Sequence, residues 1–255
     1  MEQRIIALAD TIWSAEEVGG LVLLTMLVGT GLYLTLRMGL PQFRYFQHAV
    51  LLTMGKFDKA EDPGEVSHFQ ALSAALSGTV GIGNIAGVAT AIAFGGPGAV
   101  FWLWVTAAFG MATKFTECSL AVRFREKNDD GSYSGGPMYS IRKGLSSRFG
   151  FLAWIFAGAA VLASFGIGNM VQANTVAQQV YTTSRTHFGM AVPTWVTGLI
   201  MAGLLSLVIV GGIKRIAKVA SRLVPIMAIV YVIGAVIVAV THWNQLPAAL
   251  WLIFD

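Results

Sequence analysis

Charge, cysteine and histidine are scarce in this chain, and their scarcity excludes several classes of protein. Only 12% of the 255 residues are charged, whereas 55% are hydrophobic; ordinary soluble domains have about 25% charged residues. This composition excludes soluble enzymes, nucleic-acid-binding proteins and disordered regulators, and it predicts an integral membrane protein. The single cysteine, Cys118, excludes an intrachain disulfide and a cysteine-based metal cage, and the four histidines lie far apart in the sequence.

Motifs for catalysis and nucleotide binding are also lacking. The chain contains no Walker motif, so nothing in it indicates ATP-driven transport. A membrane-embedded enzyme would need paired acidic residues or a histidine cluster at one depth, and the apolar stretches offer only Glu117. The sequence therefore predicts no enzyme, no cofactor and no nucleic-acid partner.

Residues 1–17 are more acidic than basic, with Arg4 as their one basic residue. They therefore lack the basic leading segment of a signal peptide. Apolar residues recur in this segment at helical spacing, opposite polar ones. We expect an interfacial helix that lies in the headgroup plane.

Six stretches that largely lack charge are long enough to cross a membrane as helices. The first would be about 28 Å long, close to the roughly 30 Å of the hydrocarbon core. Charged residues interrupt only the third stretch, at Lys114 and Glu117. The sequence thus predicts an all-α integral membrane protein with spans at residues 18–36, 69–94, 99–122, 151–181, 192–210 and 223–240.

The distribution of Lys and Arg predicts the orientation, because basic connections stay on the cytoplasmic side. Of the 17 basic residues, 14 lie in the connections after spans 1, 3 and 5, and the opposite side carries only Arg4 and Arg185. We expect a multi-pass protein of the cell (inner) membrane with its N-terminus outside and residues 241–255 as an external tail. In the connection after span 3, Pro137 and Gly144 are typical of the start and the end of a short surface helix.

Span 2 contains the most informative run in the chain, Ser-Gly-Thr-Val-Gly-Ile-Gly-Asn-Ile-Ala-Gly at residues 77–87. Glycine destabilises a helix by about 1 kcal/mol relative to alanine, so Gly78, Gly81 and Gly83 favour an interruption. Unwound backbone at membrane depth is tolerated only inside protein or along a water-filled cavity. Its carbonyls suit a cation, and the amides that begin the second half-helix suit a carboxylate.

Two other interpretations of this run were considered. Close helix packing through small residues accounts for the glycines, but not for Thr79 and Asn84 beside them. The spacing of Gly81, Gly83 and Ala86 formally matches a dinucleotide-binding fingerprint. That function fails on context, because the flanking residues form a membrane span and no acidic residue occurs between those at positions 65 and 117.

Two further spans carry polar residues. Lys114 and Glu117 lie one helical turn apart and form a candidate intramembrane ion pair, with a role as a gate or a proton relay. A structural pair of Glu117 with Arg123, with Lys114 reaching toward the interface, is the simpler interpretation. In span 4, Asn169 and Gln172 lie one turn apart and can face one cavity. A purely interhelical hydrogen-bonding role accounts equally well for both.

Four motifs carry a resemblance to a known family. They are the run Ser-Gly-Thr-Val-Gly-Ile-Gly-Asn-Ile-Ala-Gly-Val-Ala-Thr-Ala-Ile from Ser77, Gly-Gly-Pro-Gly-Ala-Val-Phe-Trp from Gly95, Lys-Phe-Thr-Glu-Cys from Lys114 and Gly-Gly-Pro-Met-Tyr from Gly135. Together they strongly resemble the alanine or glycine:sodium symporter family, the amino-acid carrier proteins, over at least residues 65–180. Residues 81–84 also resemble the broken first core helix of neurotransmitter:sodium symporters.

The resemblance implies a five-plus-five inverted-repeat fold of the neurotransmitter:sodium symporter type. Residues 18–36 would be an extra transmembrane helix, and residues 69–240 would be the first five-helix repeat, with a broken span 2. Family members continue for about the same length again. A chain that stops at Asp255 is therefore expected to be a truncated product or half of a split gene, with a separately encoded second half as its partner.

The resemblance also assigns roles to residues of this sequence. The carbonyls of Ser77 and Val80 would face sodium. A second group would face the substrate carboxylate: Thr79, Gly81, Ile82 and Gly83. Asn84 would lie beside this group. Gln172 would contact the amino acid, and Asn169 joins it because the two can face one cavity.

These observations predict a secondary transporter that imports a small neutral amino acid, alanine or glycine, by alternating access. Sodium is the expected coupling ion, and protons are the second candidate. A channel or a structural pore-forming subunit is the alternative function, because such a protein would use the same broken helix as a fixed filter.

Overall fold

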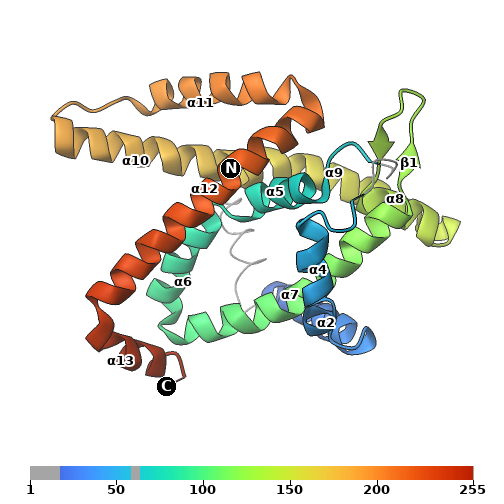
Figure 1. Ribbon diagram of the computed structural model, residues 1–255, viewed down its shortest axis with the longest axis horizontal. Helices are drawn as coiled ribbons and strands as arrows, with labels where there is room; N and C mark the ends of the chain where they lie inside the picture. Colours follow the sequence, from blue (N-terminus) through green and yellow to red (C-terminus); the bar gives the residue numbers. More distant parts are fainter. Residues whose placement is uncertain (1–17, 59–63, 255) are drawn as a thin grey trace.

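The computed structural model describes residues 18–58 and 64–254, and most of these residues are helical (Figure 1). The interfacial helix predicted for residues 1–17 lies outside the described residues. The described strands are two, β1 (Glu126–Lys127) and β2 (Tyr133–Ser134), which pair antiparallel in a short hairpin. The chain is therefore a mostly helical protein, as its composition predicts.

Each predicted span coincides with a helical segment, and two of these segments are interrupted. The segments are α2 (Val18–Arg37); α5 (His68–Thr79) with η1 (Gly83–Gly87) and α6 (Val88–Gly95); α7 (Gly98–Arg123); α9 (Phe151–Phe165) with η3 (Gly166–Met170) and α10 (Val171–Phe188); α11 (Thr194–Ile209); and α12 (Gly212–Thr241). Short helices connect them or follow them: α3 (Pro41–Arg44), α4 (Phe46–Thr53), α8 (Pro137–Gly144), η2 (Ser147–Phe149), η4 (Trp243–Gln245) and α13 (Leu246–Trp251). The surface helix expected to begin at Pro137 is confirmed as α8, with proline in its first turn.

Length and composition decide which of these helices can cross a membrane. Within the described residues, α7, α12 and the run from Ser147 to Phe188 are long and apolar enough. The bent pair of α5 with η1 and α6 adds a fourth if it crosses as one span. α11, with 16 residues, reaches about 24 Å, which is shorter than the hydrocarbon core. The structure thus supports three to four apolar spans, and the count of six stays a prediction.

Small residues allow the helices to approach each other closely. α2 packs against α7, where a Cβ atom at Gly31 would lie 2.8 Å from the Cβ atom of Phe109. The buried apolar residues of the described chain are small: Ala112, Ala153, Ala177, Ala217, Ala220 and Val224. Most of the Leu, Ile, Phe and Trp side chains are exposed instead. This arrangement is typical of helices whose outer surfaces contact lipid or further helices.

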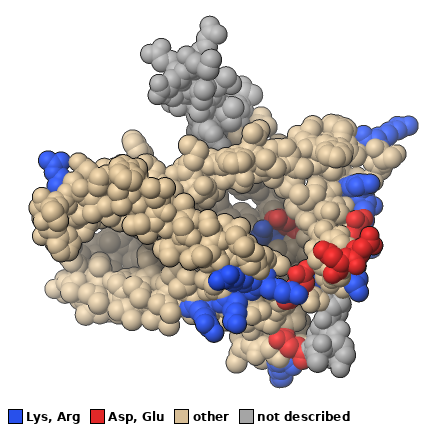
Figure 2. Space-filling model, turned by 90° about the horizontal axis from the view of Figure 1, so that it is seen from above, with Lys and Arg blue, Asp and Glu red and all other residues tan. Residues whose placement is uncertain are grey.

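The connections that were predicted to lie on opposite sides of the membrane gather at opposite ends of the molecule. In Figure 1, β1 and α8 lie on the right, whereas the turn from α6 to α7 and the turn from α10 to α11 lie on the left. In the face drawn in Figure 2, charged side chains occupy mainly the centre and the right. The two sets of connections are thus separated, and which end faces the cytoplasm stays a prediction.

Polar contacts join the segments at the charged end. The backbone amide of Tyr133 donates to the Glu65 carboxylate over 3.0 Å, which ties β2 to the residues before α5. Lys143 Nζ lies 2.7 Å from Glu126 Oε1 and ties α8 to β1. The hydrogen bond from Lys143 lowers the pKa of Glu126 below its ordinary value.

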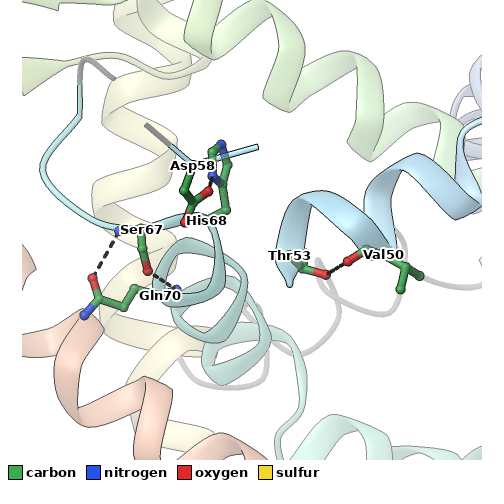
Figure 3. A network of polar contacts seen from close by, with 6 residues as sticks. All are labelled: Val50, Thr53, Asp58, Ser67, His68 and Gln70. Carbon is green, nitrogen blue, oxygen red and sulfur yellow. Dashed lines mark hydrogen bonds and ion pairs between the residues drawn. The ribbon is translucent and has the colours of Figure 1, made fainter. Parts of the chain in front are cut away.

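The first turn of α5 is fixed by its own side chains (Figure 3). Ser67 Oγ accepts from the backbone amide of Gln70, and Gln70 Oε1 accepts from the backbone amide of Ser67 over 3.1 Å. This reciprocal capping box satisfies two amides that have no partner within the helix, so α5 begins at His68. His68 Nδ1 also contacts Asp58 Oδ1, which ties the start of α5 to the loop after α4.

We predict that Asp129→Cys and Thr186→Cys, each made with Cys118→Ala, label from opposite sides of the membrane. Both side chains are exposed, and they belong to connections that the charge distribution separates. A membrane-impermeant maleimide should label the cysteine at position 186 in intact cells. It should label the cysteine at position 129 only after the cells are permeabilised. Labelling of both cysteines in intact cells would contradict the predicted orientation.

Candidate functional site

The candidate site is the interruption between α5 and η1. Val80 has an extended backbone (φ −84°, ψ 95°), helical geometry resumes at Ile82, and the two halves are bent by 52°. None of the three glycines at positions 78, 81 and 83 has a positive φ. These glycines therefore favour the interruption by weakening the helix, not by adopting a left-handed backbone.

The interruption exposes backbone groups of both half-helices. The Leu76 carbonyl accepts from the Val80 amide over 2.7 Å. The carbonyls of the α5 residues after Leu76 have no helical partner, because the helix has no next turn whose amides could donate to them. On the other side, the Asn84 amide donates to the Gly81 carbonyl over 3.0 Å. Carbonyls thus lie on one side of the break and the start of a helix on the other.

Two hydroxyls beside the break donate back into α5. Ser77 Oγ donates to the Ala74 carbonyl over 2.7 Å, and Thr79 Oγ1 donates to the Ala75 carbonyl over 2.8 Å. A hydroxyl has one proton and two acceptor lone pairs. With the proton used inside α5, each hydroxyl keeps acceptor capacity that suits sodium or an ammonium group. A contact between Thr79 and a carboxylate would require the hydroxyl to give up its present bond.

Gln172 of α10 lies against the break. A Cβ atom at Gly81 would be 3.2 Å from Gln172 Oε1 and 3.5 Å from Gln172 Nε2, whereas a Cβ atom at Gly83 would meet nothing within 4 Å. The structure therefore brings together two predicted substrate-binding residues that are far apart in the sequence. A side chain at position 81 would require the end of Gln172 to move by a few tenths of an ångström.

Asn169 lies in a second interruption, the π-helical segment η3 between α9 and α10. The residue that begins it, Gly166, has a distorted backbone (φ −81°, ψ −86°). η1 is also π-helical and contains Asn84. Short π-helical segments inside α-helices occur frequently at functional sites. Periodicity does not predict these segments, although a Gly-Asn pair inside an apolar helix marks both, at residues 83–84 and 168–169.

The residues around the break are open to their surroundings in this chain. Gly81 and Ile82 are half-buried, and the remaining predicted site residues are exposed: Ser77, Thr79, Val80, Gly83, Asn84, Asn169 and Gln172. Within the described residues, no three His, Cys, Asp or Glu side chains gather into a metal site. The oxygen ligands that this wall offers to a cation are therefore backbone carbonyls, hydroxyls and side-chain amides.

The ionisable residues of α7 form a pair with each other. Lys114 Nζ lies 3.1 Å from Glu117 Oε2, and the two side chains are 64% and 44% exposed. Glu117 thus pairs with Lys114 and not with Arg123, whose guanidinium carbon lies 5.8 Å from the ring centre of Phe124. The simpler interpretation, a pair of Glu117 with Arg123, was wrong, because Lys114 is three residues away on the same helical face.

Comparison with known proteins gives a consistent result. The sequence profile of the sodium:alanine symporter family matches residues 2–255. The sodium/alanine symporter AgcS of Methanococcus maripaludis is 46% identical over 236 residues, which are 91% of this chain and 50% of the relative. An uncharacterized transporter of Haemophilus influenzae is 44% identical over 256 residues, 100% of this chain and 53% of the relative. YrbD of Bacillus subtilis, named as a candidate sodium/proton-dependent alanine carrier protein, is 41% identical over 255 residues, 100% of this chain and 49% of the relative. The chain spans about half the length of these relatives.

We predict that Gly81→Ala destabilises the protein, whereas Gly83→Ala does not. An added methyl group at position 81 shifts the end of Gln172, and we expect this strain to outweigh the roughly 0.4–1 kcal/mol that alanine gains over glycine. At position 83 the space is open, and replacing glycine by alanine in a helix stabilises by roughly 0.4–1 kcal/mol. Melting temperatures in detergent should therefore fall for the first variant and rise or stay constant for the second.

The contact with Gln172 is tested by a double-mutant cycle. Gln172→Ala removes the neighbouring amide, so Gly81→Ala should lose its destabilising effect in that background. An equal change in melting temperature in both backgrounds would contradict the contact.

Proposed function

The chain belongs to the sodium:alanine symporter family, a family of transporters and not of enzymes, and we propose that it serves the symport of a small neutral amino acid, alanine or glycine, with sodium. The main support is the position of Gln172 beside Gly81, because it brings a side-chain amide from another helix to the interruption. Interrupted helices of this kind form substrate and ion sites in secondary transporters. Protons are the second candidate for the coupling ion, since the name of YrbD includes both ions.

We assign sodium to the α5 side of the break. The carbonyls of Ser77 and Val80 are the proposed ligands, and the Ser77 hydroxyl has acceptor lone pairs left. The Thr79 hydroxyl keeps the same acceptor capacity, and we assign it to the amino acid. Each of these groups offers an oxygen without a formal charge. Such a set can hold a monovalent cation and still release it on the other side of the membrane, which transport requires.

We assign the amino acid to the η1 side. The amides of Gly81, Ile82 and Gly83 begin the second half-helix, where its positive end favours a carboxylate. Asn84 lies beside them, and the amide oxygens of Gln172 and Asn169 suit the substrate ammonium. No ionised side chain is required to bind the zwitterion, in agreement with the absence of acidic residues between positions 65 and 117.

Alternating access would follow from the way the two half-helices are held. α5 packs mainly against α12, and α6 packs against α7. The bend at residues 80–82 therefore joins two bodies that can change their relative angle around a fixed site. We further propose six spans, an N-terminus outside the cell membrane, and a first five-helix repeat at residues 69–240, with the opposite wall of the site supplied by residues equivalent to the other half of the relatives.

Thr79→Val tests the site in a sodium-driven alanine uptake assay. Residues 1–255 are joined to the C-terminal half of Methanococcus maripaludis AgcS and reconstituted into vesicles. The change removes the hydroxyl but keeps the shape, and an unsatisfied polar partner costs roughly 1–3 kcal/mol, so the half-maximal alanine concentration should rise by about tenfold or more. Thr90→Val is the matched control, because Thr90 Oγ1 makes the same 2.8 Å bond to the carbonyl four residues earlier, away from the break.

The outcomes separate the proposed functions. An unchanged alanine dependence in Thr79→Val, or an equal effect of Thr90→Val, would contradict the assigned site. Saturable uptake that follows the sodium gradient supports a carrier. Single-channel conductance without accumulation would favour the channel alternative.

A further inference from the structure

Four basic side chains crowd the start of α12. They are exposed and line one open pocket of about 550 Å³, which contains Gly211, Lys214, Arg215, Lys218, Val219 and Arg222. The spacing of four residues places Lys214, Lys218 and Arg222 in one row along the helix. These groups belong to no part of the candidate transport site.

The local backbone holds this row on the outer side of α12. The stem of Arg215 lies over the turn between α11 and α12, where it occupies the space that a Cβ atom at Gly211 would need. Ala217 and Ala220 are buried on the other flank of the helix, and α12 packs mainly against α5. The basic groups therefore face away from the helix packing.

Among the residues that the structure describes, no carboxylate balances these four charges. The sequence has no acidic residue between Asp130 and Asp255, so α11 and α12 contain none, and α5 has none either. Within the part of the chain that the structure describes, none of the four forms an ion pair. The other basic connections differ, since Lys143 pairs with Glu126. The pocket thus collects positive charge whose counter-ion must come from outside these helices.

The row lies at the depth of lipid headgroups. The uncharged part of α12 begins at Leu223 and runs for 18 residues to Val240, about 27 Å, which nearly fills the hydrocarbon core. Arg222 adjoins its edge, and Lys218 lies about 6 Å further out along the helix. A basic side chain at this depth meets the phosphate groups of the cytoplasmic leaflet if the predicted orientation holds.

We propose that this pocket binds the phosphodiester headgroup of an anionic phospholipid. The three basic groups of the row and Arg215 surround the phosphate, and guanidinium groups can donate two parallel hydrogen bonds to it. The acyl chains then lie along the exposed apolar residues that follow Arg222 on α12. The site is separate from transport of the amino acid.

The test measures which lipid the protein retains. The full chain is reconstituted in nanodiscs of equal parts phosphatidylglycerol and phosphatidylcholine, and native mass spectrometry counts the lipids that remain bound. The wild type should retain phosphatidylglycerol in preference to phosphatidylcholine. Each basic side chain near an anionic surface contributes roughly a fivefold preference, so the triple variant Lys214→Gln, Lys218→Gln, Arg222→Gln should lose about tenfold or more.

A matched variant separates a site from general charge. Lys127→Gln, Arg142→Gln, Arg148→Gln removes the same charge from exposed residues at the same end of the molecule, outside the pocket. It should keep the preference for phosphatidylglycerol, and an equal loss would overturn the proposal. Inorganic phosphate is added to the detergent-solubilised wild type as a second arm. Retention of free phosphate with no preference among lipids would identify a phosphate site and also overturn it.

A second measurement does not depend on the folding of the triple variant. A photoreactive benzoylphenylalanine replaces Val219, which lines the pocket, and all four basic residues stay in place. Irradiation in native membranes should attach an anionic phospholipid to this position. Exclusive attachment of zwitterionic lipid, or of no lipid, would contradict the proposed site.

Discussion

The need to satisfy backbone groups at membrane depth is the constraint on which the rest of this structure depends. Between Thr79 and Ile82 the chain leaves the helix, and in the predicted span lipid would offer no partners for the amides and carbonyls that are freed. Nearby residues satisfy only some of these groups: the Leu76 and Gly81 carbonyls accept from the amides of Val80 and Asn84. From another helix, Gln172 places its side-chain amide beside Gly81 at the break. A polar residue of the run from α9 to α10 thus lies next to the interruption in a different segment.

The same constraint explains why the glycines of the break are not equivalent. None of them has a positive φ, so a left-handed turn does not require any of them. Gly81 is distinguished by its neighbour, because Gln172 fills the space of a side chain, whereas Gly78 and Gly83 have open surroundings. Glycine weakens the helix at positions 78, 81 and 83, but only at position 81 does it leave room for a neighbouring side chain, that of Gln172. A ligand that approaches the amides beyond Gly81 would use the same space.

Periodicity and charge predicted the positions of the helices well, because these patterns are local and a long apolar run has few alternatives to a helix. The site was predicted in part. The interruption follows from three glycines in one span, but the contact of Gln172 with Gly81 joins residues far apart in sequence, and only the family resemblance suggested it. Spacing predicted the pair of Lys114 with Glu117 as one of two interpretations, since two cations lay within reach of one carboxylate. The two π-helical segments were missed because their signal, a Gly-Asn pair, also fits helix packing.

The packing of the broken helix gives the two inferred sites a mechanical relation. α5 is held by α12, whose first turns carry the uncompensated basic row, whereas α6 is held by α7. A lipid headgroup bound to that row would fix α12 relative to the membrane surface, and α5 with it. The bend at residues 80–82 would then be the place where motion of α6 and α7 is taken up, because the extended backbone at Val80 interrupts the continuous helix there. If both proposals hold, the interruption that exposes polar backbone to a substrate would also separate an anchored half of the helix from a movable one.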